Sequence, residues 1–437
     1  MSSLSDILKE IETLPLGNVY IKKINNKKYY YHQYFLNGKR YSEILKNDKA
    51  LEMIKLVKRR KELEKLANEY RKKERLGHLS KSADKLTGEV MLENTPVAKF
   101  ENGVLIEINE KLAPLVIKRT RSLEKFLMLR VIDMSRTNAR ILKKILNIQI
   151  DEDYKTALYS YALSIFDSYW FKPKHSKLKY HNVIFNNDIY FEAALKGDVT
   201  VYPHQAKLTP EITTTGSFEK GWKYIKGVWY LYKSGNDKQI FSELFCDKFA
   251  QLMGINTATY EYDNGYIRSP NFATNYNFEP MAALLDDNDK YEDVFFALLK
   301  IDRNIAKDYL KLIFFDSVVD NVDRHNENLG LLRNKKNGST ISLAPNYDNN
   351  LALIANKDSL NKNVAKDKFV GIFIEFINKH KEAKDLFKEI QFKEIVFEDI
   401  ANIINDIPIK VDNMEDLINS VLIRYKYLKD LFNKQHN

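Results

Sequence analysis

The chain has 437 residues, of which 44% are hydrophobic and 12% aromatic, so it is long and apolar enough to bury one large core or several ordinary ones. This excludes a disordered chain, and the single cysteine, Cys246, excludes an intramolecular disulfide and a cysteine-based metal site. The formal net charge of +10 favours acidic partners, without choosing among nucleic acid, a phosphorylated substrate and an acidic protein surface.

Neither export nor membrane insertion is expected. The N-terminal residues 1–15 mix charged side chains with short apolar pieces and lack the unbroken apolar core of a signal peptide. The longest apolar stretches fall far short of the roughly 20 residues that span a bilayer. We therefore expect a cytoplasmic protein without a membrane partner.

Residues 1–80 are predicted to form a small β-hairpin sheet followed by a long basic helix. Three strands, at 19–24, 28–34 and 39–41, are separated by the turn pairs Asn25-Asn26 and Asn37-Gly38. The helix begins after Asp48 and carries basic clusters at 58–61 and 71–73. These clusters are either nucleic-acid contacts or, more commonly, part of a solvated face of alternating Lys and Glu, so direct nucleic-acid binding stays open.

Residues 81–206 are predicted to form an accessory region with strands at 89–92, 97–100 and 104–108 and a helix-rich block from 122 to about 171. Residues 207–285 follow as a β-rich lobe with strands at 217–226 and 228–233 and a helix at 240–253. Residues 286–437 are mainly helical, at 291–299, 306–319, 369–377, 383–387 and 414–432. This order predicts an α+β, two-lobed protein-kinase-like domain behind an N-terminal extension.

Two short segments carry the chemistry. Residues 323–330 are Asp-Arg-His-Asn-Glu-Asn-Leu-Gly, and residues 343–348 are Leu-Ala-Pro-Asn-Tyr-Asp. Phosphoryl transfer requires a carboxylate that orients the attacking hydroxyl and hard oxygen ligands for Mg²⁺. Asp323 precedes Asn328 by five positions, as the catalytic Asp precedes the metal-binding Asn in protein kinases, and Asp348 follows a predicted hairpin at 329–333 and 339–343.

The predicted nucleotide lobe contains a further charged pair. Lys233 ends an apolar strand, and Glu243 follows ten residues later in the next predicted helix. A strand lysine aimed by a helix glutamate is the arrangement that fixes the α- and β-phosphates in kinases. Lys220 and Lys226 are rival candidates for the lysine.

Two further cofactor contacts are expected in the same lobe. The segment 213–220 lies where a phosphate-covering loop belongs, and its hydroxyls and backbone N–H groups are suited to phosphate, with Thr215, Gly216 and Ser217 at its centre. The adenine-binding hinge is expected within residues 277–281, with Glu279 and Met281 as contacts.

The two segments at 323–330 and 343–348 resemble the signature of HipA-like serine/threonine kinases, and the resemblance extends from Thr213 to the C-terminus, about half the chain. It implies Asp323 as catalytic base, Asn328 and Asp348 as Mg²⁺ ligands, His325 as a supporting catalytic residue, and Arg324 in contact with phosphate or holding the loop. It also implies ATP as cofactor and a protein substrate, in the setting of a toxin that acts on translation machinery and is paired with a DNA-binding antitoxin. A regulatory phosphorylation site is implied in the loop at 213–217.

Departures from protein kinases keep alternatives open. The Asp-Phe-Gly metal motif is replaced by Tyr347-Asp348-Asn349, and the Asp-Arg-His-x-x-Asn string also resembles phosphoinositide lipid kinases. A non-catalytic nucleotide- or nucleic-acid-binding protein is the remaining alternative. The presence together of Lys233, Asp323, Asn328 and Asp348 argues against a degenerate kinase.

Overall fold

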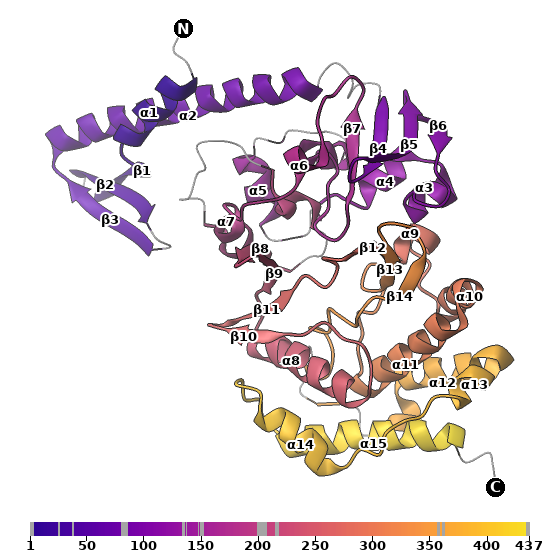
Figure 1. Ribbon diagram of the computed structural model, residues 1–437. Coiled ribbons are helices and arrows are strands. Elements are labelled where there is room, and N and C mark those ends of the chain that lie inside the picture. The colour runs from indigo at the N-terminus through magenta and orange to yellow at the C-terminus, as the bar shows by residue number, and fades with distance from the viewer. Residues whose placement is uncertain are drawn as a thin grey trace.

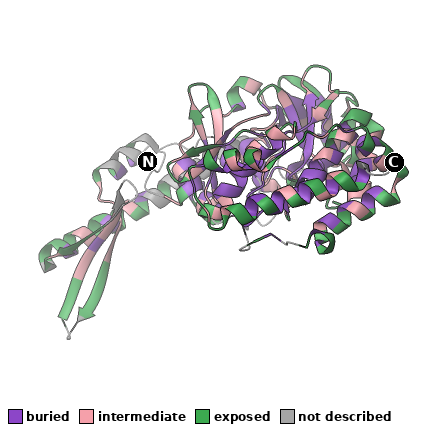
Figure 2. Ribbon diagram, turned by 90° about the horizontal axis from the view of Figure 1, so that it is seen from below, coloured by how far each residue is buried: buried purple, intermediate pink, exposed green. Residues whose placement is uncertain are grey.

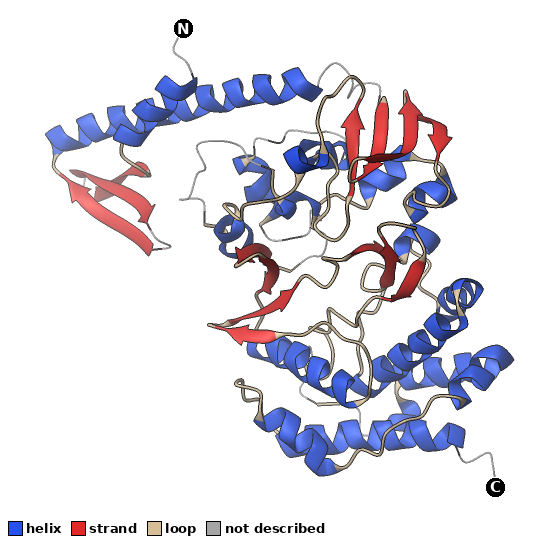
Figure 3. Cartoon of the chain, in the orientation of Figure 1, coloured by secondary structure: helices blue, strands red, loops and turns tan. Residues whose placement is uncertain are grey.

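In a computed structural model of the chain, the described residues are 4–24, 27–36, 39–79, 86–132, 136, 138–146, 148, 153–198, 208–214, 218–355, 359–360 and 363–433. Helices and four antiparallel sheets alternate along them, as Figures 1 and 3 show. The α+β class predicted from the sequence is confirmed. None of the described helices is long and apolar enough to cross a membrane.

The N-terminal unit stands beside the rest of the molecule in Figure 1. Its three strands pair in the order β1-β2-β3, which confirms the predicted small sheet, while the predicted turn pairs Asn25-Asn26 and Asn37-Gly38 lie outside the described residues. A small apolar cluster of Ile7, Ile11 and Leu63 joins the two helices of the unit. Its elements are α1 (Leu4–Thr13), β1 (Asn18–Ile24), β2 (Lys27–Leu36), β3 (Lys39–Leu45) and α2 (Asn47–Leu79).

The next unit contains a four-stranded sheet in the order β6-β5-β4-β7, with short helices around it. The strands are β4 (Gly88–Leu92), β5 (Thr95–Glu101), β6 (Val104–Ile108) and β7 (Tyr169–Pro173). The helices are α3 (Leu115–Thr120), α4 (Leu123–Met128), α5 (Ala139–Ile145), η2 (Asp153–Ser160), α6 (Tyr180–Val183), α7 (Phe191–Lys196) and η3 (Pro210–Thr213).

The structure corrects one prediction in this unit. The helix-rich block was expected to continue to about residue 171, but Tyr169–Pro173 forms strand β7, which pairs with β4 from Leu92↔Tyr169 to Gly88↔Pro173. The pairing partner lies some 80 residues earlier in the chain, so the strand is stabilised by contacts that local periodicity does not report.

The β-rich lobe is a four-stranded sheet in the order β10-β11-β9-β8, packed with helix α8. Asn236 caps α8, since its side chain accepts a hydrogen bond from the Gln239 backbone while the Gln239 side chain accepts one from the Asn236 backbone. The elements are β8 (Lys220–Ile225), β9 (Val228–Lys233), α8 (Asp237–Leu252), β10 (Glu261–Asp263) and β11 (Tyr266–Pro270).

A small three-stranded sheet, in the order β12-β13-β14, connects the β-rich lobe to the helical lobe. Strand β12 was not predicted, because its partner β13 lies some 50 residues later in the chain, beyond helices α9 to α11. These elements are β12 (Tyr276–Pro280), α9 (Ala282–Leu285), α10 (Tyr291–Ile301), α11 (Arg303–Val319), β13 (Gly330–Asn334) and β14 (Thr340–Leu343).

The C-terminal helices complete the molecule, and the predicted helices of this lobe are confirmed to within a few residues. Buried residues are concentrated in the helical lobe and in the sheets of the two preceding units, whereas the N-terminal unit is largely exposed, as Figure 2 shows. One large core unites α8, α10 and α11 with the C-terminal helices. These are η4 (Val364–Lys366), α12 (Lys368–Lys379), α13 (Lys381–Lys388), α14 (Phe397–Asn405) and α15 (Met414–Asn433).

Candidate active site

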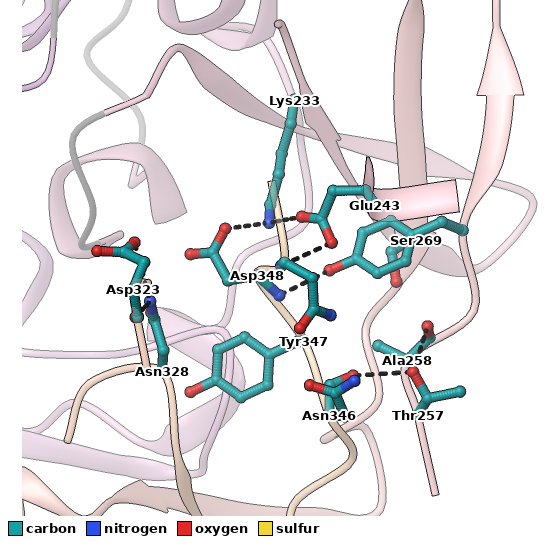
Figure 4. A network of polar contacts seen from close by, with 12 residues as sticks. Lys233, Glu243, Thr257, Ala258, Ser269, Asp323, Asn328, Asn346, Tyr347 and Asp348 are labelled. Carbon is teal, nitrogen blue, oxygen red and sulfur yellow. Dashed lines mark hydrogen bonds and ion pairs between the residues drawn. The ribbon is translucent and has the colours of Figure 1, made fainter. Parts of the chain in front are cut away.

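The predicted lysine and glutamate meet in the β-rich lobe. Lys233 is the last residue of β9, and its Nζ lies 2.9 Å from Oε1 of Glu243 on α8 and 2.7 Å from Oδ1 of Asp348. Figure 4 shows the ammonium between the two carboxylates. Burial alone would lower the pKa of Lys233, but Asp348 and Glu243 raise it well above its usual value. The lysine is therefore a fixed, buried positive charge.

Glu243 also holds the chain next to Asp348. Its second oxygen accepts a hydrogen bond from the Asn349 backbone N–H at 2.9 Å, and the Asp348 N–H donates to the Tyr260 hydroxyl at 3.3 Å. Asp348 itself has a φ of 61°, the left-handed region that non-glycine residues rarely adopt. These contacts stabilise that conformation and aim the Asp348 carboxylate at Lys233.

The charge of Asp348 is well stabilised. Burial would raise its pKa, but the neighbouring Lys233 and Lys220 ammonium groups outweigh burial and hold the pKa below its usual range. Lys220, a rival candidate for the strand lysine, is thus close enough to act on the same carboxylate. The structure places Lys233, not Lys220, between the two acids. Lys226 lies exposed at the turn between β8 and β9.

The loop with Asp323 and Asn328 begins where α11 ends, at Asp320, whose left-handed backbone turns the chain away from the helix. The Asn328 amide nitrogen donates to the backbone carbonyl of Asp323 at 3.0 Å and to its Oδ2 at 3.4 Å. Burial raises the pKa of Asp323. His325 lowers this pKa, and the negative charge of Asp348 raises it further. A carboxylate with a raised pKa is better suited to accept a proton near neutral pH.

Arg324 connects this loop to the Asp348 loop. Its guanidinium contacts the Asp316 carboxylate at 2.9 and 3.0 Å, and Asp316 lies buried on α11. Its remaining acceptors are the carbonyl oxygens of Asn328 (2.8 Å) and Tyr347 (3.0 Å) and the amide oxygens of Asn346 (2.6 Å) and Asn349 (2.9 Å). A guanidinium has five N–H groups, and all five are directed at protein acceptors here. This favours the loop-holding role for Arg324 over its predicted contact with the cofactor.

One cavity of ≈ 240 Å³ is lined by six of the nine predicted site residues that the structure describes. Lys233, Asp323, His325, Asn328 and Asp348 all line it. Aromatic side chains on the same wall provide a surface for a planar ring, which no single stretch of sequence indicated. They are Phe166, Phe272, Phe278 and Tyr347.

The predicted hinge residues are placed differently. Glu279 lines the cavity, but its carboxylate accepts a hydrogen bond from the Leu115 N–H at 2.6 Å and forms an ion pair with Arg333. Met281 is fully buried, is not part of the cavity lining, and donates its N–H to the carbonyl of Leu329. The side chain of Met281 is therefore a core residue, and its predicted contact with adenine has no support in this geometry.

The predicted phosphate-covering residues Thr215, Gly216 and Ser217 lie outside the described residues. The segment just before them is firmly held. Thr213 and Thr214 line the cavity, and the Trp222 indole N–H donates to the Thr214 hydroxyl at 3.0 Å.

Sequence reasoning did not assign a role to Tyr260 or Asp316. Tyr260 lies beneath Lys233, whose Nζ is 5.5 Å from the ring centroid. Asp316 occurs on an otherwise apolar helix stretch, and a buried acid in such a stretch was the one signal that could have found it.

Comparison with known proteins shows which fold this chain shares. The sequence matches no protein-family model and no curated protein. Among solved structures, the chain is similar to the proinflammatory kinase CtkA of Helicobacter pylori, at 17% identity over 49% of this chain and 93% of that one, with a TM-score of 0.40.

The chain is also similar to HipA of Shewanella oneidensis MR-1, a toxin–antitoxin protein solved with HipB and its operator DNA. Identity is 12%, the TM-score is 0.53, and the match covers 80% of this chain and 99% of HipA. The chain has a HipA-like kinase fold. The HipA-like fold extends over more of the chain than the half in which sequence motifs suggested it.

Proposed function

We propose that this HipA-like chain is an ATP-dependent kinase that transfers the γ-phosphate of ATP to a serine or threonine hydroxyl of a protein. The observation that carries the proposal is the buried Lys233, held between Glu243 and Asp348 in a cavity that Asp323 and Asn328 also line. This is the set of groups that phosphoryl transfer requires, at one place.

Each residue of the site would have its own role in phosphate transfer. Lys233 supplies a fixed positive charge for phosphate oxygens, and Glu243 keeps its Nζ in place. Asp323 would accept a hydrogen bond from the substrate hydroxyl and take its proton, for which its raised pKa suits it. His325 lines the cavity beside Asp323. Arg324 fixes both loops, so that Asp323 and Asp348 keep their relative positions.

The donor set fits Mg²⁺. No three His, Cys, Asp or Glu side chains of the described residues group as a self-sufficient metal site. Mg²⁺ bound with phosphates needs only one or two protein oxygens, because phosphate and water complete its shell. The Asp348 carboxylate and the Asn328 amide oxygen would provide them, since the Asn328 nitrogen is directed at Asp323. The ion would supply charge stabilisation at the phosphates.

The biological setting is proposed by analogy of fold. HipA of Shewanella oneidensis forms part of a toxin–antitoxin system and was solved with HipB and operator DNA. We propose on this basis that the present chain is the toxin of such a pair and that a small DNA-binding antitoxin is its partner. Co-purification of the chain with the product of an adjacent gene would test this.

The test of the kinase is transfer of labelled phosphate from ATP, with Mg²⁺, to the chain itself and to proteins of a host lysate. Asp323→Ala and Asp348→Ala should each lower transfer by about 10²-fold to 10⁴-fold, because one removes the base and the other a metal ligand.

Asp385→Ala is the matched control, since Asp385 is exposed on α13 and lies outside the cavity lining. Transfer that survives both active-site substitutions would contradict the proposal. A wild-type chain that binds ATP but transfers no phosphate to any protein in the lysate would favour a nucleotide-binding protein instead, and labelling of lipid rather than protein would favour a lipid kinase.

A further inference from the structure

The positive charge of the chain is concentrated in its N-terminal unit. Residues 1–79 contain 19 Lys and Arg against 10 Asp and Glu, a net charge of +9, whereas the whole chain has a net charge of +10. The kinase-like remainder is therefore close to neutral. Any long-range attraction for an acidic partner originates in a unit that the proposed catalytic chemistry does not use.

The arginines of helix α2 serve the unit's own structure. Arg59 Nε contacts Glu10 Oε1 at 2.8 Å, and Arg60 Nη1 donates to the carbonyl oxygens of Ile11 and Leu14. These contacts fasten α1 onto α2. The basic helix, for which nucleic-acid contact was one of two interpretations, thus has part of its charge committed to internal contacts.

One face of the sheet is directed towards the helices. His32 on β2 is buried, and its ring nitrogens contact the Leu16 carbonyl at 2.7 Å and the Glu43 carboxylate at 3.0 Å. Helix α2 packs against β1 and β2. Because paired residues of antiparallel strands share a face, Val19, His32 and Glu43 mark the helix side.

Tyrosines lie on both faces of the sheet: Tyr34 stacks on Tyr41 on the His32 face, and Tyr20, Tyr29 and Tyr31 lie on the other. The pairs Tyr20↔Tyr31, Lys22↔Tyr29 and Tyr31↔Ile44 lie one residue out of phase with the buried His32 and so lie on the opposite face of the sheet. On this open face Tyr20 is 49%, Tyr29 38% and Ile44 66% exposed. The Lys22 ammonium lies 5.1 Å from the centroid of the Tyr31 ring. Lys27, two residues before Tyr29 on the same strand, is also exposed.

Exposed tyrosines interleaved with lysines suit one kind of partner. A tyrosine ring stacks on a nucleic-acid base, and a neighbouring lysine contacts the phosphate that follows it. Bases in a duplex are already stacked on one another, so aromatic faces select unpaired bases. An acidic protein would also contact lysines, but the alternation of rings with ammonium groups matches the repeating base and phosphate of a nucleic-acid strand.

We propose that the open face of the β1–β3 sheet binds single-stranded nucleic acid, with Tyr20, Tyr29 and Tyr31 stacking on bases and Lys22 and Lys27 contacting phosphates. This surface is separate from the active-site cavity, whose lining includes no residue of the N-terminal unit. It does not depend on the kinase activity.

The experiment measures binding of the full-length chain to fluorescently labelled strands of 20 deoxythymidines or 20 uridines and to a duplex of equal length, by anisotropy. Single strands should bind more tightly than the duplex, and their affinity should fall about sevenfold between about 50 and 200 mM salt if two lysines contact phosphates. Tyr20→Ala and Tyr29→Ala should each weaken single-strand binding by about tenfold or more, whereas Tyr29→Phe should keep it, because phenylalanine also stacks.

Tyr262→Ala is the matched control, since Tyr262 is 42% exposed on β10, far from this sheet in the chain and outside its face. Circular dichroism of each variant shows that it is folded. The proposal is overturned if neither single strand binds, if the duplex binds as tightly, or if folded Tyr20→Ala and Tyr29→Ala variants bind as well as the Tyr262→Ala control. A difference between the two single strands identifies DNA or RNA as the preferred partner.

Discussion

Lys233 is the residue on which the proposed site depends most. It is one cation facing the buried Glu243 and the partly buried Asp348, and the three groups come from β9, α8 and the loop after β14. Burial raises the pKa of Glu243, and Lys233 opposes that rise by keeping an opposite charge beside the carboxylate. Removing the cation therefore affects both stability and function.

We predict that Lys233→Met lowers the free energy of unfolding by about 3 kcal/mol or more, because it leaves the buried Glu243 and the partly buried Asp348 without their partner. The same variant should bind ATP more weakly than the wild type. Urea denaturation and ATP titration measure the two effects. Lys226→Met, at the exposed turn before β9, is the control and should change neither. Equal stability of the two variants would mean that the buried charges are compensated in some other way.

At the scale of elements, the accessory region and the β-rich lobe are joined by a buried acid. Glu211 in η3 accepts a hydrogen bond from the Trp222 N–H on β8 at 2.7 Å and contacts Arg136 Nη2 at 3.2 Å. Arg136 also donates to the Lys220 carbonyl. Glu211 thus anchors the chain two residues before the predicted phosphate-covering segment 213–220.

The protonation of Glu211 should make stability depend on pH. Burial raises its pKa from 4.5 to about 7, although Arg136 opposes the rise. Between these two values the folded chain binds more protons at this site than the unfolded chain, so this contribution to stability is present below pH 4.5 and is lost as the pH rises through 7.

The corresponding prediction compares wild type with Glu211→Gln. From pH 4.5 to 7, the free energy of unfolding of the wild type should fall relative to that of the variant by up to about 3 kcal/mol. Urea denaturation at steps of pH measures this difference. Glu398→Gln, at an exposed position on α14, should run parallel to the wild type. A Glu211→Gln curve that also runs parallel would show that Glu211 does not titrate in this range.

At the scale of the whole molecule, the N-terminal unit and the kinase-like region have separate apolar cores. Ile7, Ile11 and Leu63 form a cluster that includes no buried residue of the lobes, while the main core lies around α8, α11 and the C-terminal helices. Figure 1 shows the long helix α2 extending along the accessory region, on the side away from the helical lobe. A region with its own core unfolds largely independently.

We therefore predict that deletion of residues 1–79 leaves the thermal midpoint of the lobes unchanged within about 2 °C, since no buried part of their core is removed. Phosphate transfer by the shortened chain should equal that of the full chain. Differential scanning calorimetry and the labelled-ATP assay measure both quantities. A large fall in the midpoint would show that the unit stabilises the lobes through its surface.

The sequence by itself determined the parts of this protein whose signals are local. Helical periodicity located α8, α10, α11, α12, α13 and α15, and the spacing of Asp323, Asn328 and Asp348 indicated phosphoryl transfer. The ten-residue interval between Lys233 and Glu243 indicated their pairing, while Lys220 and Lys226 stayed rival candidates until the structure placed Lys233 beside Glu243. These features can be recognised from residues that lie close together in the sequence.

Only the tertiary structure decided the features that depend on distant partners. β7 and β12 form because β4 and β13, far away in the chain, provide their hydrogen bonds. Arg324 acts as a loop anchor because acceptors from three segments surround it, and Met281 is a core residue because β12 leads it inwards. Burial and hydrogen-bond partners arise from packing, and a motif that names a residue's type does not specify which groups will surround it.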